Sequence, residues 1–256
     1  MKKYFLLILV VLVVPLSSIT AQEMINESMQ VVTESVVYDL ENGIQGYLAR
    51  PEDKGQYPGL ILIHEWWGLN DNIREFAQSF ARTGYVALAV DLYNGQSAQT
   101  PDEARRLATA VRNNLPAAFD NLTKAVDFIR SSPYVKKHRI ASVGWCFGGG
   151  WSYEMARNDM GVRASIMYYG RFSPDDDFSN MRALILGNFG EKDRSISVDS
   201  VREFQATLKT LNGDHEIYIY PNAGHAFANS DSANYNKEAA DLAWQRTIAF
   251  LDKHLQ

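Results

Sequence analysis

Short apolar runs alternate with longer amphipathic stretches along most of this chain. The later runs are continuously apolar, which is typical of parallel strands that are covered on both faces. The strand candidates span residues 31–38, 44–49, 60–63, 85–90, 140–143, 164–168, 183–186 and 216–220. Strands separated by helical stretches in this way predict an α/β protein with right-handed crossovers.

The stretches between these runs show the periodicity of helices. Segment 102–131 is predicted to form two helices that meet at Pro116. The dipeptide Asn42-Gly43 between the first two runs is a hairpin signal, so the sheet is expected to open with an antiparallel pair. We therefore expect one domain over residues 28–256, a doubly wound, mostly parallel sheet with helices on both faces. The apolar helical faces are Ile73, Phe76, Ala77 and Phe80; Val201, Phe204, Leu208 and Leu211; and Ala240, Ala243, Trp244, Thr247, Ile248 and Leu251.

The first residues have the composition of a secretory signal. A basic start, Lys2-Lys3, precedes eleven apolar residues from Tyr4 to Val14, and small residues lead to Ala21. A membrane anchor is the alternative, but this run is shorter than the roughly 20 residues that a spanning helix needs. We expect residues 1–21 to be cleaved, the protein to be exported to the periplasm or secreted, and no stable membrane anchor to remain.

Composition narrows the possible functions. The chain has 256 residues, one cysteine and a net charge of −5. A single cysteine excludes an intramolecular disulfide framework and a multi-cysteine metal site, and no His-Cys-acid spacing indicates a metal. The mild acidity gives no reason to expect nucleic acid as a partner. We expect a monomer without metal or cofactor that acts on a small molecule.

The lone cysteine lies at the end of a buried strand candidate, between glycines. The segment Gly144-Trp145-Cys146-Phe147-Gly148 follows the run 140–143, and a helix is expected to begin near Phe147. This is the G-x-S-x-G nucleophile elbow with cysteine in place of serine. A sharp turn would lift the side chain above the sheet, and the helix N-terminus would favour a thiolate. A buried structural cysteine is the alternative, but inside this motif we expect a nucleophile.

An acid and a base follow in the order that such hydrolases use. Asp193 lies in the loop after the run 183–186, and His225 lies in the loop after 216–220. Both loops are expected at the carboxyl edge of the sheet, beside Cys146. Glu191 is a spare acid. The other histidines are weaker candidates. His138 lies in a basic run expected on the surface, His215 opens the last strand candidate, and His254 is near the terminus. His64 either packs at a strand end or lines the site.

A second segment, His64-Glu65-Trp66-Trp67-Gly68-Leu69-Asn70, joins a strand to a helix capped near Asn70 or Asp71. In this fold the corresponding loop donates one oxyanion N–H and the residue after the nucleophile donates the other, which points to Trp66 and Phe147. Glu65 is either a capping or surface acid, or it contacts the Cys146 thiol and takes part in its activation. Several aromatic residues could wall an apolar pocket, namely Trp66, Trp67, Trp145, Phe189 and Phe227.

Together these motifs resemble the dienelactone hydrolase family over nearly the whole chain after residue 21. The matching segments are Gly144-x-Cys146-x-Gly148-Gly149, residues 64–70, Asp91-Leu92-Tyr93, Gly190-x-x-Asp193 and Gly224-His225-x-Phe227. The resemblance implies the α/β-hydrolase fold with Cys146, Asp193 and His225 as a catalytic triad. It also implies that Glu65 helps to generate the thiolate when substrate arrives.

For substrate binding, the resemblance implies Arg106 as a carboxylate ligand, and Asn229 replaces a second arginine of the family. Trp67 is also expected to contact the substrate. The expected reaction is hydrolysis of an ester or lactone through a thioester on Cys146. A thioesterase or amidase that uses the same residues is one alternative, and a non-catalytic exported binding protein with the hydrolase fold is another.

Overall fold

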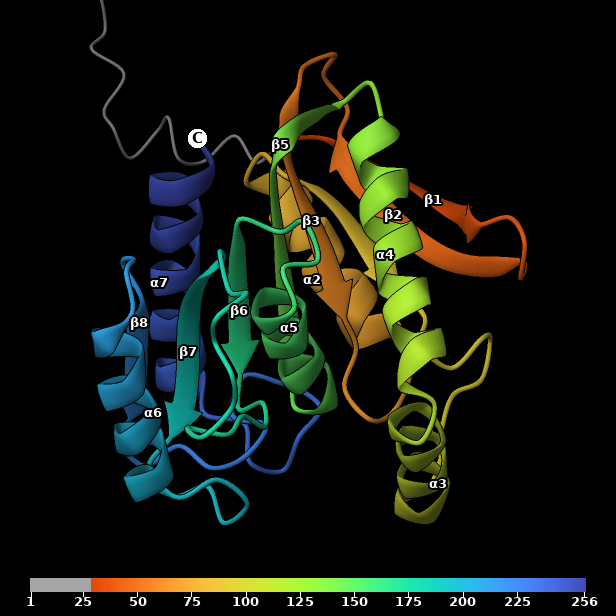
Figure 1. Ribbon diagram of the computed structural model, residues 1–256. Coiled ribbons are helices and arrows are strands. Elements are labelled where there is room, and N and C mark those ends of the chain that lie inside the picture. Colours follow the sequence, from red (N-terminus) through yellow and green to blue (C-terminus); the bar gives the residue numbers. More distant parts are fainter. Residues whose placement is uncertain (1–28) are drawn as a thin grey trace, which may run out of the picture.

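The computed structural model describes residues 29–256, so the predicted signal peptide lies outside the described residues. Eight strands form one sheet in the order β1-β2-β4-β3-β5-β6-β7-β8 (Figure 1). The strands are β1 (Val31–Asp39), β2 (Ile44–Pro51), β3 (Tyr57–Ile63), β4 (Val86–Val90), β5 (Val135–Trp145), β6 (Ala164–Tyr168), β7 (Leu184–Gly190) and β8 (Glu216–Tyr220).

The direction of the strands follows the sequence prediction. β1 and β2 are antiparallel, β2 is antiparallel to β4, and all other neighbours are parallel. The turn between β1 and β2 contains Gly43 at φ 67°, a conformation that glycine adopts readily. The antiparallel opening pair and the mostly parallel sheet are confirmed.

Helices cover both faces of the sheet, as predicted. α2 (Asp71–Arg82) and α7 (Lys237–Leu255) pack on one face, and α3 (Pro101–Arg112), α4 (Leu115–Ser131), α5 (Phe147–Arg157) and α6 (Val198–Thr210) pack on the other. Each face of the sheet has its own hydrophobic core. In β3, Leu60 and Leu62 pack in the core under α2 and α7, and Ile61 and Ile63 pack in the core on the other face, because alternate side chains of a strand point to opposite faces. Among residues 29–256, none of the helices combines the length and apolar character that crossing a bilayer requires.

β5 and β7 extend furthest beyond the apolar runs that predict them. β5 includes the basic residues 136–139, which precede the predicted run 140–143. His138 is exposed, as expected, and so is its neighbour Lys137. β7 continues to Gly190 because its last residues pair with β8. It contains a polar residue, Asn188, whose buried side chain accepts a hydrogen bond from the Tyr220 hydroxyl at 2.7 Å. Hydrophobicity alone misses a strand residue such as Asn188, which is polar but buried.

The glycines of the elbow allow β5, α5 and β3 to pack closely. A Cβ atom on Gly144 would lie 2.0 Å from the carbonyl oxygen of Gly148, and one on Gly148 would lie 2.1 Å from that of Ile63. Both distances are far inside van der Waals contact, so only glycine fits. At Gly150, the nearest atom would be the Arg171 carbonyl oxygen at 3.5 Å, an ordinary contact.

We expect Gly148→Ala and Gly150→Ala to have opposite effects in urea unfolding. Gly148→Ala introduces the overlap with Ile63 and should lower the free energy of unfolding by more than about 2 kcal/mol or prevent folding. Gly150→Ala should change it by little or raise it by roughly 0.5–1 kcal/mol, because alanine favours the helix. Similar losses in the two variants would contradict this packing.

Candidate active site

Cys146 adopts the strained turn that the elbow motif predicts. Its φ of 52° and ψ of −111° place a non-glycine residue in a region that costs on the order of 1–3 kcal/mol. The strain is held by two backbone hydrogen bonds, from Cys146 N to Tyr168 O at 2.9 Å and from Gly150 N to Cys146 O at 3.2 Å. The half-buried thiol therefore lies at the N-terminus of α5, where the helix dipole favours negative charge.

Asp193 and His225 are paired beside Cys146. His225 Nδ1 lies 2.7 Å from Asp193 Oδ2, and the Asp193 side chain has no solvent exposure. The other carboxylate oxygen accepts hydrogen bonds from Ser195 N at 2.7 Å and Ile196 N at 3.2 Å. The carboxylate is thus fixed by the backbone, and it in turn fixes the orientation of the imidazole.

This environment stabilises the protonated form of His225. Burial alone would lower the pKa of the imidazole, but attraction to Asp193 and to the Cys146 sulfur outweighs burial and raises it to about 10. Because Nδ1 of His225 is paired with Asp193, Nε2 is the ring nitrogen left to face Cys146. A base of this kind can take up and hold the proton of a thiol.

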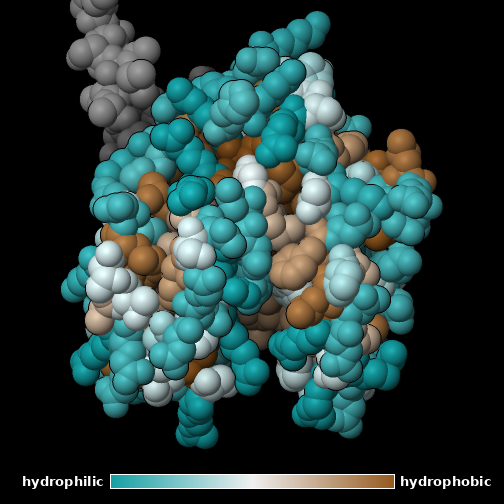
Figure 2. Space-filling view, viewed as in Figure 1, coloured by the Kyte–Doolittle hydropathy of each residue, from teal (hydrophilic) through white to brown (hydrophobic). Residues whose placement is uncertain are grey.

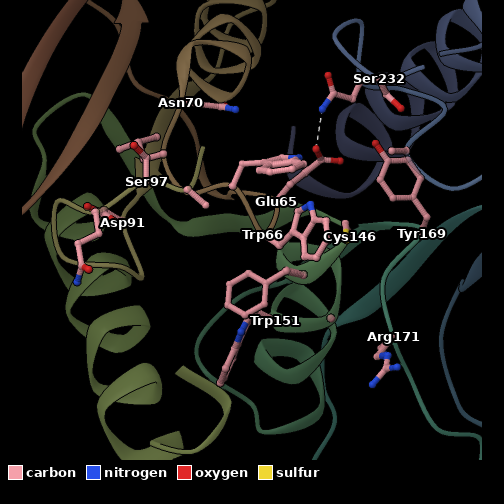
Figure 3. A pocket seen from close by; sticks show the side chains of 18 of the residues that line it. Glu65, Trp66, Asn70, Asp91, Ser97, Cys146, Trp151, Tyr169, Arg171 and Ser232 are labelled. Atoms are coloured by element: carbon pink, nitrogen blue, oxygen red, sulfur yellow. Dashed lines mark hydrogen bonds between the residues drawn. The ribbon is translucent and has the colours of Figure 1, made fainter. Parts of the chain in front are cut away.

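Glu65 is a buried member of the site, so the capping or surface interpretation does not hold. Asn229 donates a hydrogen bond to Glu65 Oε2 at 2.6 Å, and both residues are buried. Within residues 29–256, Oε1 and the Tyr169 hydroxyl have no hydrogen-bond partner. Burial raises the pKa of Glu65, and the Asn229 hydrogen bond opposes this only in part. Figure 3 shows Glu65 and Tyr169 on either side of Cys146.

His64 is a packing residue that holds the Glu65 loop. Its Nε2 accepts a hydrogen bond from Leu92 N at 3.2 Å, so Nδ1 carries the proton and donates to Glu65 O at 2.6 Å. Burial lowers the pKa of His64, which keeps the ring neutral. The loop after β3 is thereby tied to the loop after β4.

The site opens into a cavity of about 1480 Å³. Trp66, Trp67 and Asn229 line it, together with Cys146, Glu65 and His225. Trp145, Phe189 and Phe227, which were candidates for the pocket wall, are instead fully buried in the core. For these three residues the sequence could not distinguish an apolar pocket from an apolar interior.

The structure does not bring Arg106 to the cavity. Arg106 is exposed on α3, whereas Arg112, at the end of the same helix, is among the lining residues. The Arg112 guanidinium lies 5.4 Å from the centre of the Phe147 ring. Arg171, in the loop after β6, is a second lining arginine that the sequence did not indicate. Neither residue belongs to a motif, so no local signal could have found them.

The two expected oxyanion donors lie directly after Cys146 and directly after Glu65 in the chain. Phe147 is the first residue of α5, so its N–H has no acceptor within the helix. Trp66 follows Glu65 in the β3 loop, and its carbonyl oxygen accepts a hydrogen bond from the Tyr93 hydroxyl at 3.1 Å. This position is compatible with the oxyanion role that the sequence predicts.

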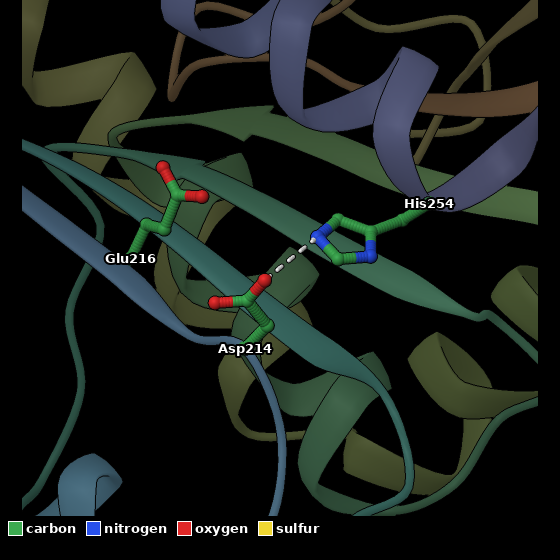
Figure 4. A group of neighbouring side chains, drawn as sticks. All are labelled: Asp214, Glu216 and His254. Carbon is green, nitrogen blue, oxygen red and sulfur yellow. Dashed lines mark ion pairs between the residues drawn. The ribbon is translucent and has the colours of Figure 1, made fainter.

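A second polar cluster lies outside the cavity lining. Ligand atoms of Asp214, Glu216 and His254 lie within 4.8 Å of one another (Figure 4). Lys253 pairs with Asp214 and lies 3.8 Å from Glu216, so an ammonium group already balances these carboxylates. We assign the cluster to ion pairing between the start of β8 and the end of α7.

Comparison with known proteins gives one consistent family. The model of the dienelactone hydrolase family matches residues 44–255. Protein usf of Aquifex pyrophilus is 34% identical over 225 residues, which cover 84% of this chain and 96% of that protein. A proposed carboxymethylenebutenolidase of Saccharolobus solfataricus is 31% identical, with 85% and 97% covered. The crystal structure of a proposed dienelactone hydrolase from Klebsiella pneumoniae has a TM-score of 0.76 at 25% identity, with 88% and 99% covered.

The pairing of His225 with Asp193 predicts an unusually high titration midpoint. NMR of labelled histidine should give a His225 midpoint near pH 10 in the parent protein and one close to the ordinary value of about 6.5 in Asp193→Asn. Because the folded pKa lies above the unfolded one, the stability gained from this proton is complete below about pH 6.5 and is lost as the pH rises through about 10. A midpoint of 6–7 in the parent protein would refute the pairing.

The contact between Glu65 and Asn229 predicts a pH-dependent defect in Asn229→Asp. Two buried carboxyl groups would then share one site, which raises their pKa values, and the variant should lose about 2–4 kcal/mol of stability at pH 7. Groups with raised pKa values favour the fold at low pH, so the loss should shrink towards pH 4. Asn180→Asp at an exposed position is the control and should show neither effect. A loss of stability in Asn229→Asp that does not depend on pH would contradict a buried contact between the two carboxyl groups.

Proposed function

Because the chain belongs to the dienelactone hydrolase family, a family of hydrolases, we propose that it cleaves an ester or lactone through a thioester on Cys146. The observation that carries this proposal is the 2.7 Å contact between Asp193 and His225 beside a cysteine held at φ 52°. The carboxymethylenebutenolidase name of the Saccharolobus relative supports lactones as substrates.

In the first step, His225 takes the proton of the Cys146 thiol and Asp193 stabilises the resulting imidazolium. The thiolate attacks the carbonyl carbon of the substrate, and the N–H groups of Trp66 and Phe147 stabilise the oxyanion. Removal of one such donor typically costs on the order of a hundredfold or more in rate. The C–O bond then breaks, His225 gives its proton to the leaving oxygen, and a thioester remains.

In the second step, His225 removes a proton from water, which attacks the thioester carbonyl. The carboxylic acid leaves and the Cys146 sulfur departs as a thiolate, which His225 can reprotonate. A lactone follows the same route, but its leaving oxygen stays joined to the acyl group through the carbon chain, so hydrolysis of the thioester gives a single hydroxy acid. No atom other than those of water and substrate is consumed.

Glu65 is proposed to take part in forming the thiolate. Its Oε2 is engaged by Asn229, whereas Oε1 is unpartnered within residues 29–256 and lies next to Tyr169 and Cys146. Asn229 carries no charge, so its role here is to position Glu65 with a neutral hydrogen bond. Trp67 contributes an aromatic wall to the substrate cavity.

We also infer export of the protein from the basic start, the apolar run and Ala21 at the N-terminus. These features support cleavage after residue 21 and a place in the periplasm or outside the cell.

The test of the proposed function is hydrolysis of 4-nitrophenyl acetate and a panel of small lactones. Cys146→Ala should lower kcat/KM by at least about a thousandfold, as for other nucleophile deletions. His225→Ala should do the same, while His138→Ala, an exposed histidine on β5, should retain full activity. If Cys146→Ala kept more than a tenth of the parent activity, Cys146 would not be the nucleophile.

A further inference from the structure

The active-site cavity continues past the reacting residues along α5. Four apolar residues, which we call the α4–α5 trough, line this extension: Leu115 and Phe119 from α4, and Phe147 and Trp151 from α5. Phe147 and Trp151 are four residues apart, so they lie on the same side of the helix, about 6 Å apart along its axis. The trough therefore begins at the residue after Cys146 and leads away from it.

The side chains of the trough are apolar, and its open part is formed by α4, because Phe147 and Trp151 are each 4% exposed. The Arg112 guanidinium lies at the inner end, 5.4 Å from the centre of the Phe147 ring. The rings of Phe119 and Trp151 meet edge to face with centres 5.7 Å apart, and those of Phe147 and Trp151 with centres 6.2 Å apart. Leu115 is 48% exposed, and it is the only exposed large hydrophobic residue within residues 29–256 that lines this cavity. Figure 2 shows a hollow of tan and brown between α4 and α5, surrounded by hydrophilic residues. Apolar surface of this kind inside an active-site cavity is suited to an apolar part of the substrate.

The topology places the trough and His225 on opposite sides of Cys146. His225 follows β8 and Asp193 follows β7, both of which lie beyond β6 from β5. α4 packs instead on β5, β3, β4 and β1, on the other side. In the proposed function, His225 protonates the leaving oxygen, so the alcohol part of an ester must lie towards β6–β8. The acyl part then points towards α4.

We propose that the α4–α5 trough binds the acyl part of the substrate, which is a bulky apolar and preferably aromatic group. The enzyme is then an esterase for arylalkanoic acids esterified to small alcohols. This assignment rests on the proposed function for the position of the leaving group. Phe147 connects the two parts, because its N–H faces the carbonyl oxygen while its ring forms the inner end of the trough. Aromatic side chains that meet edge to face accept a further ring in the same manner.

Two isomeric esters test the assignment. Methyl 3-phenylpropanoate has its ring on the acyl side, and 2-phenylethyl acetate has the same atoms with the ring on the alcohol side. The parent protein should hydrolyse the first with a kcat/KM at least about tenfold higher, since burial of a ring contributes that much or more. Equal values, or a preference for 2-phenylethyl acetate, would overturn the proposal.

A pair of matched variants locates the preference in the trough. Leu115→Glu places a charge at the open edge of the trough and should reduce the ratio of the two kcat/KM values at least threefold. Leu242→Glu makes the same change at a 39% exposed position on α7 that does not line the cavity, and should leave the ratio unchanged. If the two variants behaved alike, the trough would not carry the preference.

A binding measurement separates this proposal from the proposed function. Calorimetry with 3-phenylpropanamide and Cys146→Ala protein should show binding that Leu115→Glu weakens at least threefold and Leu242→Glu does not. If these two esters, 4-nitrophenyl acetate and the lactone panel were all left unhydrolysed, the proposed function would fail, and this measurement would still decide whether the trough binds an arylalkanoyl group. Absence of binding, or equal binding in both leucine variants, would contradict the proposal that the trough binds the acyl part of the substrate.

Discussion

The close approach of β5, α5 and β3 is the constraint on which the rest of the site depends. A Cβ atom on Gly148 would lie 2.1 Å from the carbonyl oxygen of Ile63, so the first turn of α5 can pack against the end of β3 only if position 148 is glycine. This crowding forces the sharp turn at Cys146, whose strained backbone lifts the thiol above the edge of the sheet. The same contact fixes where β3 ends, and therefore where Glu65 and Trp66 lie relative to the thiol.

The two carboxyl groups of the site differ in the partner that each one has. Asp193 is buried but receives two backbone N–H groups as well as His225, and it supports a cation. Glu65 is buried with the neutral amide of Asn229, and burial raises its pKa. Asp193 is thus held so that it orients His225, whereas burial raises the pKa of Glu65 beside Cys146.

Sequence patterns predicted the features that depend on local chemistry. The elbow, the helix start at Phe147, the cap at Asn70 and the joint near Pro116 are all set by a few neighbouring residues, and all are present. The placement of Asp193 beside His225 followed from strand order, because carboxyl ends of parallel strands share one edge. The contact between Glu65 and Asn229 joins residues 164 positions apart and could not be read from either segment. Arg112, and not Arg106, reaches the cavity, since the choice between two arginines on one helix depends on how α3 is placed.

The covalent intermediate gives the most direct test of the account. An active ester should be mixed with the protein, quenched in acid within milliseconds and analysed by mass spectrometry of proteolytic peptides. The account predicts one acyl group on the peptide that contains Cys146, and its accumulation should follow the burst of released alcohol. Full turnover with no acyl group on that peptide, or an acyl group on another residue, would contradict nucleophilic catalysis by Cys146.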